Sequence, residues 1–205
     1  MKIIGITGGV GAGKTTVLSL IKKNCNCHIL LADEAAHVVK KKGNKAFDEL
    51  VDLLGRDILA PDGEIDKGRM AGAIFAQGNK DLLLKVNEII HPRVKEFILN
   101  SIEEYRREGD VDYFFIEAAL LIEDGYRDIC DELWYIYAPE DIRADRLRSG
   151  RGYSDDKIKS IMDSQSDDET FRKNCDRIIE NAGDIDRTES EIVSILSGEN
   201  KYGRG

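Results

Sequence analysis

The apolar positions of this chain form two kinds of pattern that alternate along the sequence. Short runs rich in β-branched and aromatic residues, such as KIIGIT, are typical of strands buried on both faces of a sheet. They occupy residues 2–7, 28–32, 113–121, 132–138 and 177–181. Apolar residues at helical spacing occupy residues 14–23, 34–42, 140–149, 155–165 and 185–196. This alternation predicts an α/β fold with a five-stranded parallel sheet flanked by helices.

A long helical stretch interrupts the alternation. Residues 44–108 contain no convincing strand and have helical periodicity, and Pro92 predicts a kink or a restart within them. The polar, glycine-bearing segment 149–156 predicts a mobile loop. We therefore expect one domain made of a core, a helical insertion and a mobile lid. The core comprises residues 1–33, 110–140 and 165–198, the insertion 34–109 and the lid 141–164.

Composition narrows the class of protein. Of the 205 residues, 41% are hydrophobic and 34% are charged, as in a globular domain with a sizeable core. No apolar run approaches the roughly 18 residues of a membrane-spanning helix, and the first residues do not resemble a signal peptide. We therefore expect a cytoplasmic protein with no membrane partner. The net charge of −9 argues against nucleic acid as a partner, but it is compatible with a small anionic ligand.

Residues 8–15, GGVGAGKT, match the phosphate-binding P-loop pattern G-x-x-x-x-G-K-[ST]. The context matches too, because a buried strand precedes the segment and a helix follows it. Glycines let backbone N–H groups surround a phosphate, and the helix directs its positive dipole end to the same place. Lys14 is expected to bind the β- and γ-phosphates, and the Thr15 hydroxyl to bind Mg²⁺. The alternative is a glycine-rich turn without a ligand.

The P-loop and the first helical turn therefore predict a site for ATP and magnesium. The expected binding residues are Gly8, Gly9, Val10, Gly11, Ala12, Gly13, Lys14, Thr15 and Thr16. The chain lacks the NKxD sequence with which GTPases read guanine, and it is short for a motor ATPase. Its size, the helical insertion and an arginine-rich segment favour a kinase of a small molecule.

An ordered series of motifs resembles the dephospho-coenzyme A kinases, which complete coenzyme A synthesis. It contains GITGGVGAGKTT (5–16), LADEAAHVV (31–39), GEIDKGRMAGAIF (63–75), IIHPRV (89–94), EAALLIEDG (117–125), SQ (164–165) and CDRIIENAG (175–183). The P-loop alone indicates only a superfamily, whereas the ordered set, above all IIHP and ALLIE, is far more specific. The resemblance implies ATP-dependent phosphorylation of the ribose 3′-hydroxyl of dephospho-coenzyme A, with the helical insertion holding this acceptor.

Four further residues have candidate roles. The resemblance places the catalytic base at Asp33, although an aspartate there also suits a helix N-cap. It places Asn181 in the loop that contacts adenine. Glu117 ends an apolar run beside the P-loop and is a candidate ligand of Mg²⁺, or else an exposed carboxylate. Arg146 belongs to a cluster of four arginines, Arg143, Arg146, Arg148 and Arg151. It is expected to stabilise the transferring phosphoryl group, with a solvated helix face as the alternative.

Several positions depart from the family pattern and keep other functions open. Leu31, His37 and Ala119 replace the usual Asp, Arg and Pro, Lys67 replaces a common Arg, and Arg151 is displaced by one position. The second interpretation is therefore a kinase of the same fold for another nucleotide or small alcohol. The third is a nucleotide-binding regulatory protein with little turnover. The candidate base and the arginine cluster argue against this third interpretation, because a sensor needs neither.

Two basic residues of the insertion, Lys67 and Arg69, are candidates for contacts with acceptor phosphates. The alternative is that both simply face solvent, as such side chains commonly do. The sequence is compatible with a monomer or a small homo-oligomer.

Overall fold

The computed structural model describes residues 1–76 and 80–198. The chain divides into two compact units by its internal contacts. The first unit contains residues 1–29 and the chain from residue 109 onward, and the second contains residues 30–108.

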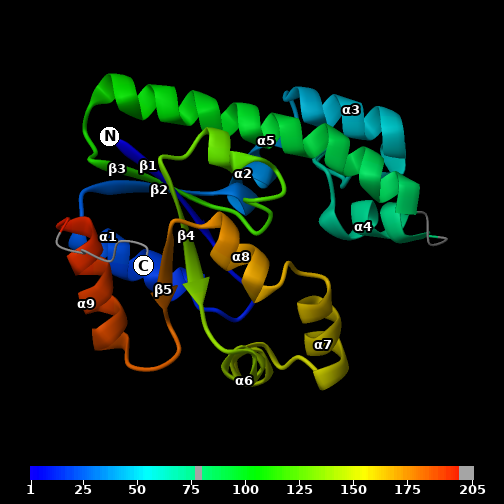
Figure 1. The fold of residues 1–205 in the computed structure, drawn as a ribbon. Helices are drawn as coiled ribbons and strands as arrows, with labels where there is room; N and C mark the ends of the chain where they lie inside the picture. Colours follow the sequence, from blue (N-terminus) through cyan, green and yellow to red (C-terminus); the bar gives the residue numbers. More distant parts are fainter. Residues whose placement is uncertain (77–79, 199–205) are drawn as a thin grey trace. The chain divides into compact units, whose positions relative to one another are not determined.

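A five-stranded parallel sheet carries the P-loop (Figure 1). Its strands are β1 (Lys2–Thr7), β2 (Cys27–Leu31), β3 (Tyr113–Glu117), β4 (Glu132–Tyr137) and β5 (Arg177–Glu180), in the spatial order β2-β3-β1-β4-β5. The central strand β1 has parallel neighbours β3 and β4, and its residues Ile3, Ile4 and Ile6 are at most 1% exposed. Burial on both faces explains the continuous apolar run. The predicted α/β fold is confirmed.

The sequence prediction of a strand over 113–121 is too long. Strand β3 ends at Glu117, and the chain then turns, with Asp124 N–H donating to Leu120 O and Gly125 N–H donating to Ile122 O. Leu121 is nevertheless fully buried. The apolar run therefore extends beyond the strand because the turn after it also contributes a side chain, Leu121, to the core.

Helices of the first unit connect and cover the strands. They are α1 (Lys14–Asn24), α6 (Glu140–Arg151), α7 (Asp155–Asp163), α8 (Asp168–Asn174) and α9 (Ile185–Leu196), with a short 3₁₀ helix η3 (Tyr126–Asp128). Helix α9 lies beside α1 (Figure 1). The short helix α8 was not predicted from the sequence. It packs on β4 through Phe171, whose ring stacks on Tyr135 with centroids 4.7 Å apart.

The predicted loop over 149–156 is mostly helical. Helix α6 continues to Arg151 and α7 begins at Asp155, so only residues 152–154 separate them. Gly152 ends α6 in the left-handed conformation (φ 63°), and the Ser154 side chain accepts a hydrogen bond from Lys157 N–H. Favourable caps on both sides thus shorten the connection.

Ionic and hydrogen-bonding contacts fix the start of β4. The Glu132 carboxylate accepts hydrogen bonds from Lys2 Nζ (2.8 Å), Trp134 Nε1 (2.8 Å) and Arg177 Nε (3.0 Å). Burial of Glu132 raises its pKa, but the hydrogen bonds outweigh this effect and lower the pKa from 4.5 to about 2. This carboxylate therefore links the three neighbouring strands β1, β4 and β5 in its charged form.

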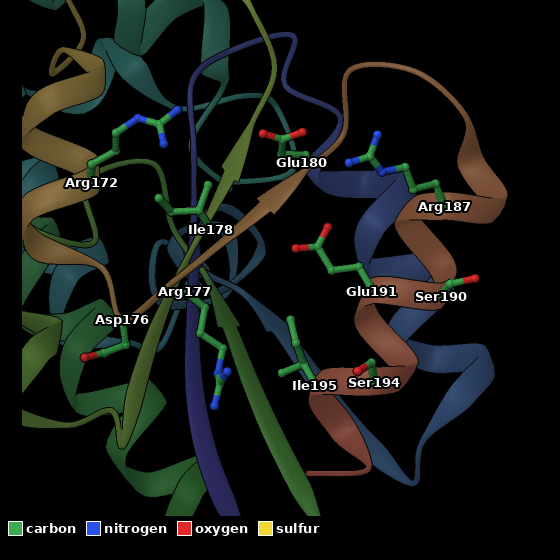
Figure 2. A pocket seen from close by; sticks show the side chains of 10 residues that line it. All are labelled: Arg172, Asp176, Arg177, Ile178, Glu180, Arg187, Ser190, Glu191, Ser194 and Ile195. Atoms are coloured by element: carbon green, nitrogen blue, oxygen red, sulfur yellow. The ribbon is translucent and has the colours of Figure 1, made fainter. Parts of the chain in front are cut away.

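The open edge of the sheet at β5 is lined by charged side chains (Figure 2). A cavity of about 600 Å³ lies between β5 and α9, and residues of both signs line it, among them Arg177, Glu180, Arg187 and Glu191. Glu191 and Ile195 extend from α9 toward the strand (Figure 2). Charged side chains and a covering helix are common ways to keep an edge strand from pairing with other chains.

The second unit is helical. It contains α2 (Ala32–Val39), α3 (Lys45–Leu54), α4 (Lys67–Phe75) and α5 (Lys80–Glu108), with a 3₁₀ helix η1 (Arg56–Ile58). Its core is a cluster of buried apolar side chains, Leu50, Ile58, Met70, Ile74 and Val86. Among the helices of the described residues, none combines the length and apolar character that crossing a bilayer requires.

Of the two alternatives predicted at Pro92, a kink or a restart, the restart does not occur. The helix runs from Lys80 to Glu108 with Pro92 inside it. Proline removes one backbone hydrogen bond, but Val86, Val94, Ile98 and Ile102 are buried on either side. Packing of this apolar stripe keeps the helix continuous.

Candidate functional site

The P-loop joins β1 to α1 and takes a conformation that requires glycine at specific positions. Gly13 has φ 88° and stands at the N-cap of α1, where a Cβ atom would lie 2.2 Å from Asn181 Nδ2. Gly8 has φ 150°, and a Cβ there would lie 2.5 Å from the Ile136 carbonyl oxygen. Both close approaches exclude a side chain. The glycines thus let the loop pass against neighbouring elements.

The start of α1 suits an anion. Gly13 provides no side-chain cap, and the first turn of the helix contains no acidic residue. Its first N–H groups and the positive end of its dipole are therefore not compensated by a capping side chain. This is the arrangement that binds phosphate at helix N-termini.

Lys14 lies across the P-loop. Its Nζ donates to the Gly8 carbonyl oxygen at 2.8 Å and lies 3.5 Å from Glu117 Oε1. Glu117 is brought there by β3, because it is paired in register with Ile6, two residues before the loop. Both side chains are only 16% exposed. The structure thus brings together two of the predicted site residues, a cation and a carboxylate.

Oxygen donors are available near the start of α1. Thr15 and Thr16, its second and third residues, are exposed, and the Glu117 carboxylate lies beside Lys14. In the part of the chain that the structure describes, no group of three or more His, Cys, Asp or Glu residues could hold a metal. This donor set fits Mg²⁺, which usually takes few protein ligands and is completed by phosphates and water.

Two side chains from α6 and the segment after α7 hold the outer part of the P-loop. Val10 N–H donates to Gln165 Oε1 at 2.9 Å, and the Val10 carbonyl accepts from Arg143 Nε at 3.0 Å. Arg143 Nη2 also donates to Gln165 Oε1 at 3.2 Å. Sequence reasoning assigned neither residue to the site. Two features of the sequence could have pointed to them. Gln165 belongs to the SQ motif, and Arg143 belongs to the arginine cluster.

Arg146 and Asn181 hold the second half of the loop. Arg146 Nη1 donates to the carbonyl oxygens of Gly11 (3.4 Å) and Ala12 (3.2 Å), and Nη2 donates to the Asn181 carbonyl oxygen at 2.7 Å. The buried Asn181 amide donates to Ala12 O at 2.8 Å. Arg146 therefore does not lie on a solvated helix face. Both predicted residues contact the P-loop through its backbone.

Asp33 lies in the second unit. It is exposed and is the second residue of α2, whose N-cap is Leu31. The expectation of an N-cap at Asp33 is therefore wrong, because the helix begins at Ala32 and not at Glu34. A carboxylate in the first turn still interacts favourably with the helix dipole.

Comparison with known proteins decides the family. A family model described as dephospho-CoA kinase matches residues 2–187. This chain belongs to the dephospho-CoA kinase family. The resemblance inferred from the motifs is thereby confirmed.

Individual relatives of this chain support the same family assignment. A dephospho-CoA kinase of Carboxydothermus hydrogenoformans is 34% identical over 196 residues, which cover 96% of this chain and 93% of that protein. One of Dehalococcoides mccartyi is 36% identical over 182 residues, covering 88% and 89%. The structure of a dephospho-CoA kinase from Campylobacter jejuni superposes with a TM-score of 0.72 at 23% identity, covers 98% of each chain and shows the common fold.

Proposed function

We propose that this chain transfers the γ-phosphate of ATP to the ribose 3′-hydroxyl of dephospho-coenzyme A, giving coenzyme A and ADP. The observation that carries the proposal is a P-loop held by side chains of α6, of the segment after α7 and of Asn181, the residue after β5. The chain also matches the family over residues 2–187. A bond forms between the 3′-oxygen and the γ-phosphorus, and the bond from this phosphorus to the β–γ bridging oxygen breaks.

The P-loop, residues 8–15, together with Thr16 is the proposed ATP site. Backbone N–H groups of the loop surround the phosphates, apart from those of Val10 and Ala12, which donate to Gln165 Oε1 and the Gly9 carbonyl oxygen. Lys14 neutralises charge on the β- and γ-phosphates. A positively charged donor fixed beside the transferring group stabilises the charge that spreads over it in the transition state.

Thr15 and Glu117 are the residues that would hold magnesium, the hydroxyl directly and the carboxylate directly or through water. Bound Mg²⁺ supplies charge neutralisation and orientation of the phosphates. Glu117 also lies 3.5 Å from Lys14 Nζ, so its negative charge helps to keep the ammonium group at the loop.

Asp33 is the proposed general base. It would orient the 3′-hydroxyl of the acceptor and accept its proton as the bond to phosphorus forms. An exposed carboxylate in the first turn of α2 is accessible to a ligand. The second unit, residues 30–108, would hold the acceptor.

Asn181 and Arg146 serve the ATP site in this proposal by holding the P-loop. Their contacts to the carbonyl oxygens of Gly11, Ala12 and Gly13 favour a role in positioning the loop. Helices α6 and α7 form the proposed lid. We further propose a cytoplasmic enzyme that acts on a small molecule, as a monomer or small homo-oligomer, with no nucleic-acid or membrane partner.

Release of ADP with a panel of acceptors tests the proposal. With Mg²⁺ and ATP, we expect rapid turnover with dephospho-coenzyme A and little with adenosine or without an acceptor. Asp33→Asn keeps the size of the side chain but cannot accept the proton, so it should slow transfer roughly 10²- to 10⁴-fold at unchanged ATP affinity. Preference for another acceptor would favour a different kinase. No turnover with any acceptor would favour a regulatory protein.

A further inference from the structure

The ammonium group of Lys14 has a carboxylate of the protein as a close neighbour. Its Nζ lies 3.5 Å from Glu117 Oε1 and donates a hydrogen bond to the Gly8 carbonyl oxygen at 2.8 Å. Both charged side chains are largely buried, so water and salt screen their attraction less than they would at the surface. The cation that is expected to bind the ATP phosphates therefore already interacts with two oxygen atoms of the protein.

The sheet fixes the backbone of Glu117 beside the P-loop. Glu117 is the last residue of β3 and is paired in register with Ile6 of β1. The next residue, Ala118, donates its N–H to the Ile6 carbonyl oxygen at 3.2 Å. Ile116 and Ala118, on either side of Glu117, are both buried. The carboxylate is thus a negative charge built into the carboxyl end of the sheet, where the P-loop begins.

The arginines that contact the P-loop are used differently from Lys14. Arg143 Nε and Arg146 Nη1 donate to carbonyl oxygens of the loop, at 3.0 Å and 3.2 Å. Within residues 1–76 and 80–198, neither arginine forms an ion pair, whereas Lys14 does. Lys14 is therefore the cation of the loop for which a carboxylate of the protein and the phosphates of a ligand would compete.

This competition has a cost for a nucleotide that carries no divalent cation. Its phosphates would have to draw Lys14 away from Glu117, and they would bring further negative charge close to the carboxylate. Like charges repel strongly where little water separates them. A divalent cation bound with the nucleotide removes both costs, because the carboxylate then has a second cation to interact with and the ammonium group can interact with the phosphates.

We propose that Glu117 makes the P-loop selective for the magnesium complex of ATP by penalising ATP that arrives without a divalent cation. This role rests on the proposed function and adds ligand discrimination to it. A carboxylate that acted only as a metal ligand would leave the affinity for metal-free ATP unchanged when it is removed. Discrimination by Glu117 requires that this affinity rises.

Equilibrium binding of ATP to the full chain, without an acceptor, tests this role. Titration calorimetry measures the affinity for ATP in EDTA and again in excess Mg²⁺. Glu117→Gln keeps the shape of the side chain and removes its charge, whereas Glu117→Asp keeps the charge. The matched control is Glu123→Gln at the next glutamate along the chain, which is exposed and accepts a hydrogen bond from Ser166 Oγ at 2.5 Å. Thermal melting of each preparation checks the fold.

In EDTA, Glu117→Gln should bind ATP about fivefold more tightly than wild type or better, because a repelling charge is removed and Lys14 is released. In Mg²⁺ it should bind ATP about tenfold more weakly, because a charged contact to the metal is lost. Glu117→Asp and Glu123→Gln should stay within about twofold of wild type in EDTA. An unchanged or lower affinity of Glu117→Gln for metal-free ATP, or an equal gain in Glu123→Gln, would overturn the discrimination. A wild type that shows this selectivity but does not phosphorylate dephospho-coenzyme A would overturn the proposed function alone.

Discussion

Replacing Arg146 with lysine tests whether this residue of α6 positions the P-loop. The guanidinium donates to the carbonyl oxygens of Gly11 and Ala12 through one nitrogen and of Asn181 through another. Lysine keeps the positive charge but has a single side-chain nitrogen. It therefore cannot donate to the P-loop carbonyls and to the Asn181 carbonyl with the planar geometry of the guanidinium group. We expect the loss of at least one charge-assisted hydrogen bond, about 1.5–3 kcal/mol.

Such a loss should mainly affect ATP binding. With about 1.4 kcal/mol for each factor of ten, the P-loop geometry that binds ATP becomes roughly 10- to 100-fold less favourable. Because the lost bonds hold the loop and not the transferring phosphoryl group, the KM for ATP should rise by this factor while kcat changes less. Arg148→Lys is the matched control on the same helix. Its guanidinium pairs with Asp145 and Asp155 at exposed positions, where ion pairs contribute about 0–1 kcal/mol.

Initial rates over a range of ATP concentrations, at saturating dephospho-coenzyme A, separate the possibilities, and thermal melting of the same preparation checks the fold. A fall in kcat at unchanged KM would refute the positioning role and support contact with the transferring phosphoryl group. Wild-type values of both parameters would remove Arg146 from the site altogether.

Three further predictions follow from the geometry. Lys14→Ala should leave the circular dichroism spectrum unchanged and lower kcat/KM for ATP roughly 10²-fold or more; normal turnover would contradict its role. Gly13→Ala should lower the melting temperature more than Gly109→Ala, because both have positive φ but only Gly13 has a neighbour, Asn181 Nδ2, within 2.2 Å of the new Cβ; equal shifts would rule out the contact. The pKa of Glu132 is depressed from 4.5 to about 2, so its stabilising effect is present above pH 4.5 and lost as pH falls toward 2. Glu132→Gln should therefore flatten the decline of unfolding free energy in this range, as measured by denaturant titration; an unchanged slope would contradict the assignment.

Local patterns in the sequence were sufficient to predict the P-loop and the sheet. The glycine spacing and the flanking strand and helix are contiguous, so one stretch of chain contains all the information. The misreadings also have local causes. Leu121 extends an apolar run although it is buried by a turn, and Pro92 suggests a restart at a position where the helix continues.

The support of the P-loop could not be predicted in the same way. Gln165 and Asn181 bond to the loop from 155 and 169 residues away, and Arg143 from 133 residues away. No periodicity in the sequence relates such distant positions. Likewise, a cavity lined by both His37 of α2 and Lys67 of α4 exists only because the helical unit packs these two helices together.

These long-range bonds also have a consequence for synthesis of the chain. The P-loop leaves the ribosome well before the side chains that bond to it at Val10 and Ala12, because these come from residues 143–181. A nascent chain that ends before Asn181 contains the complete nucleotide-binding motif without the complete set of bonds that hold it. Contacts of such sequence separation form only after a large loop has closed. Nucleotide binding during translation would therefore report completion of the C-terminal part of the fold.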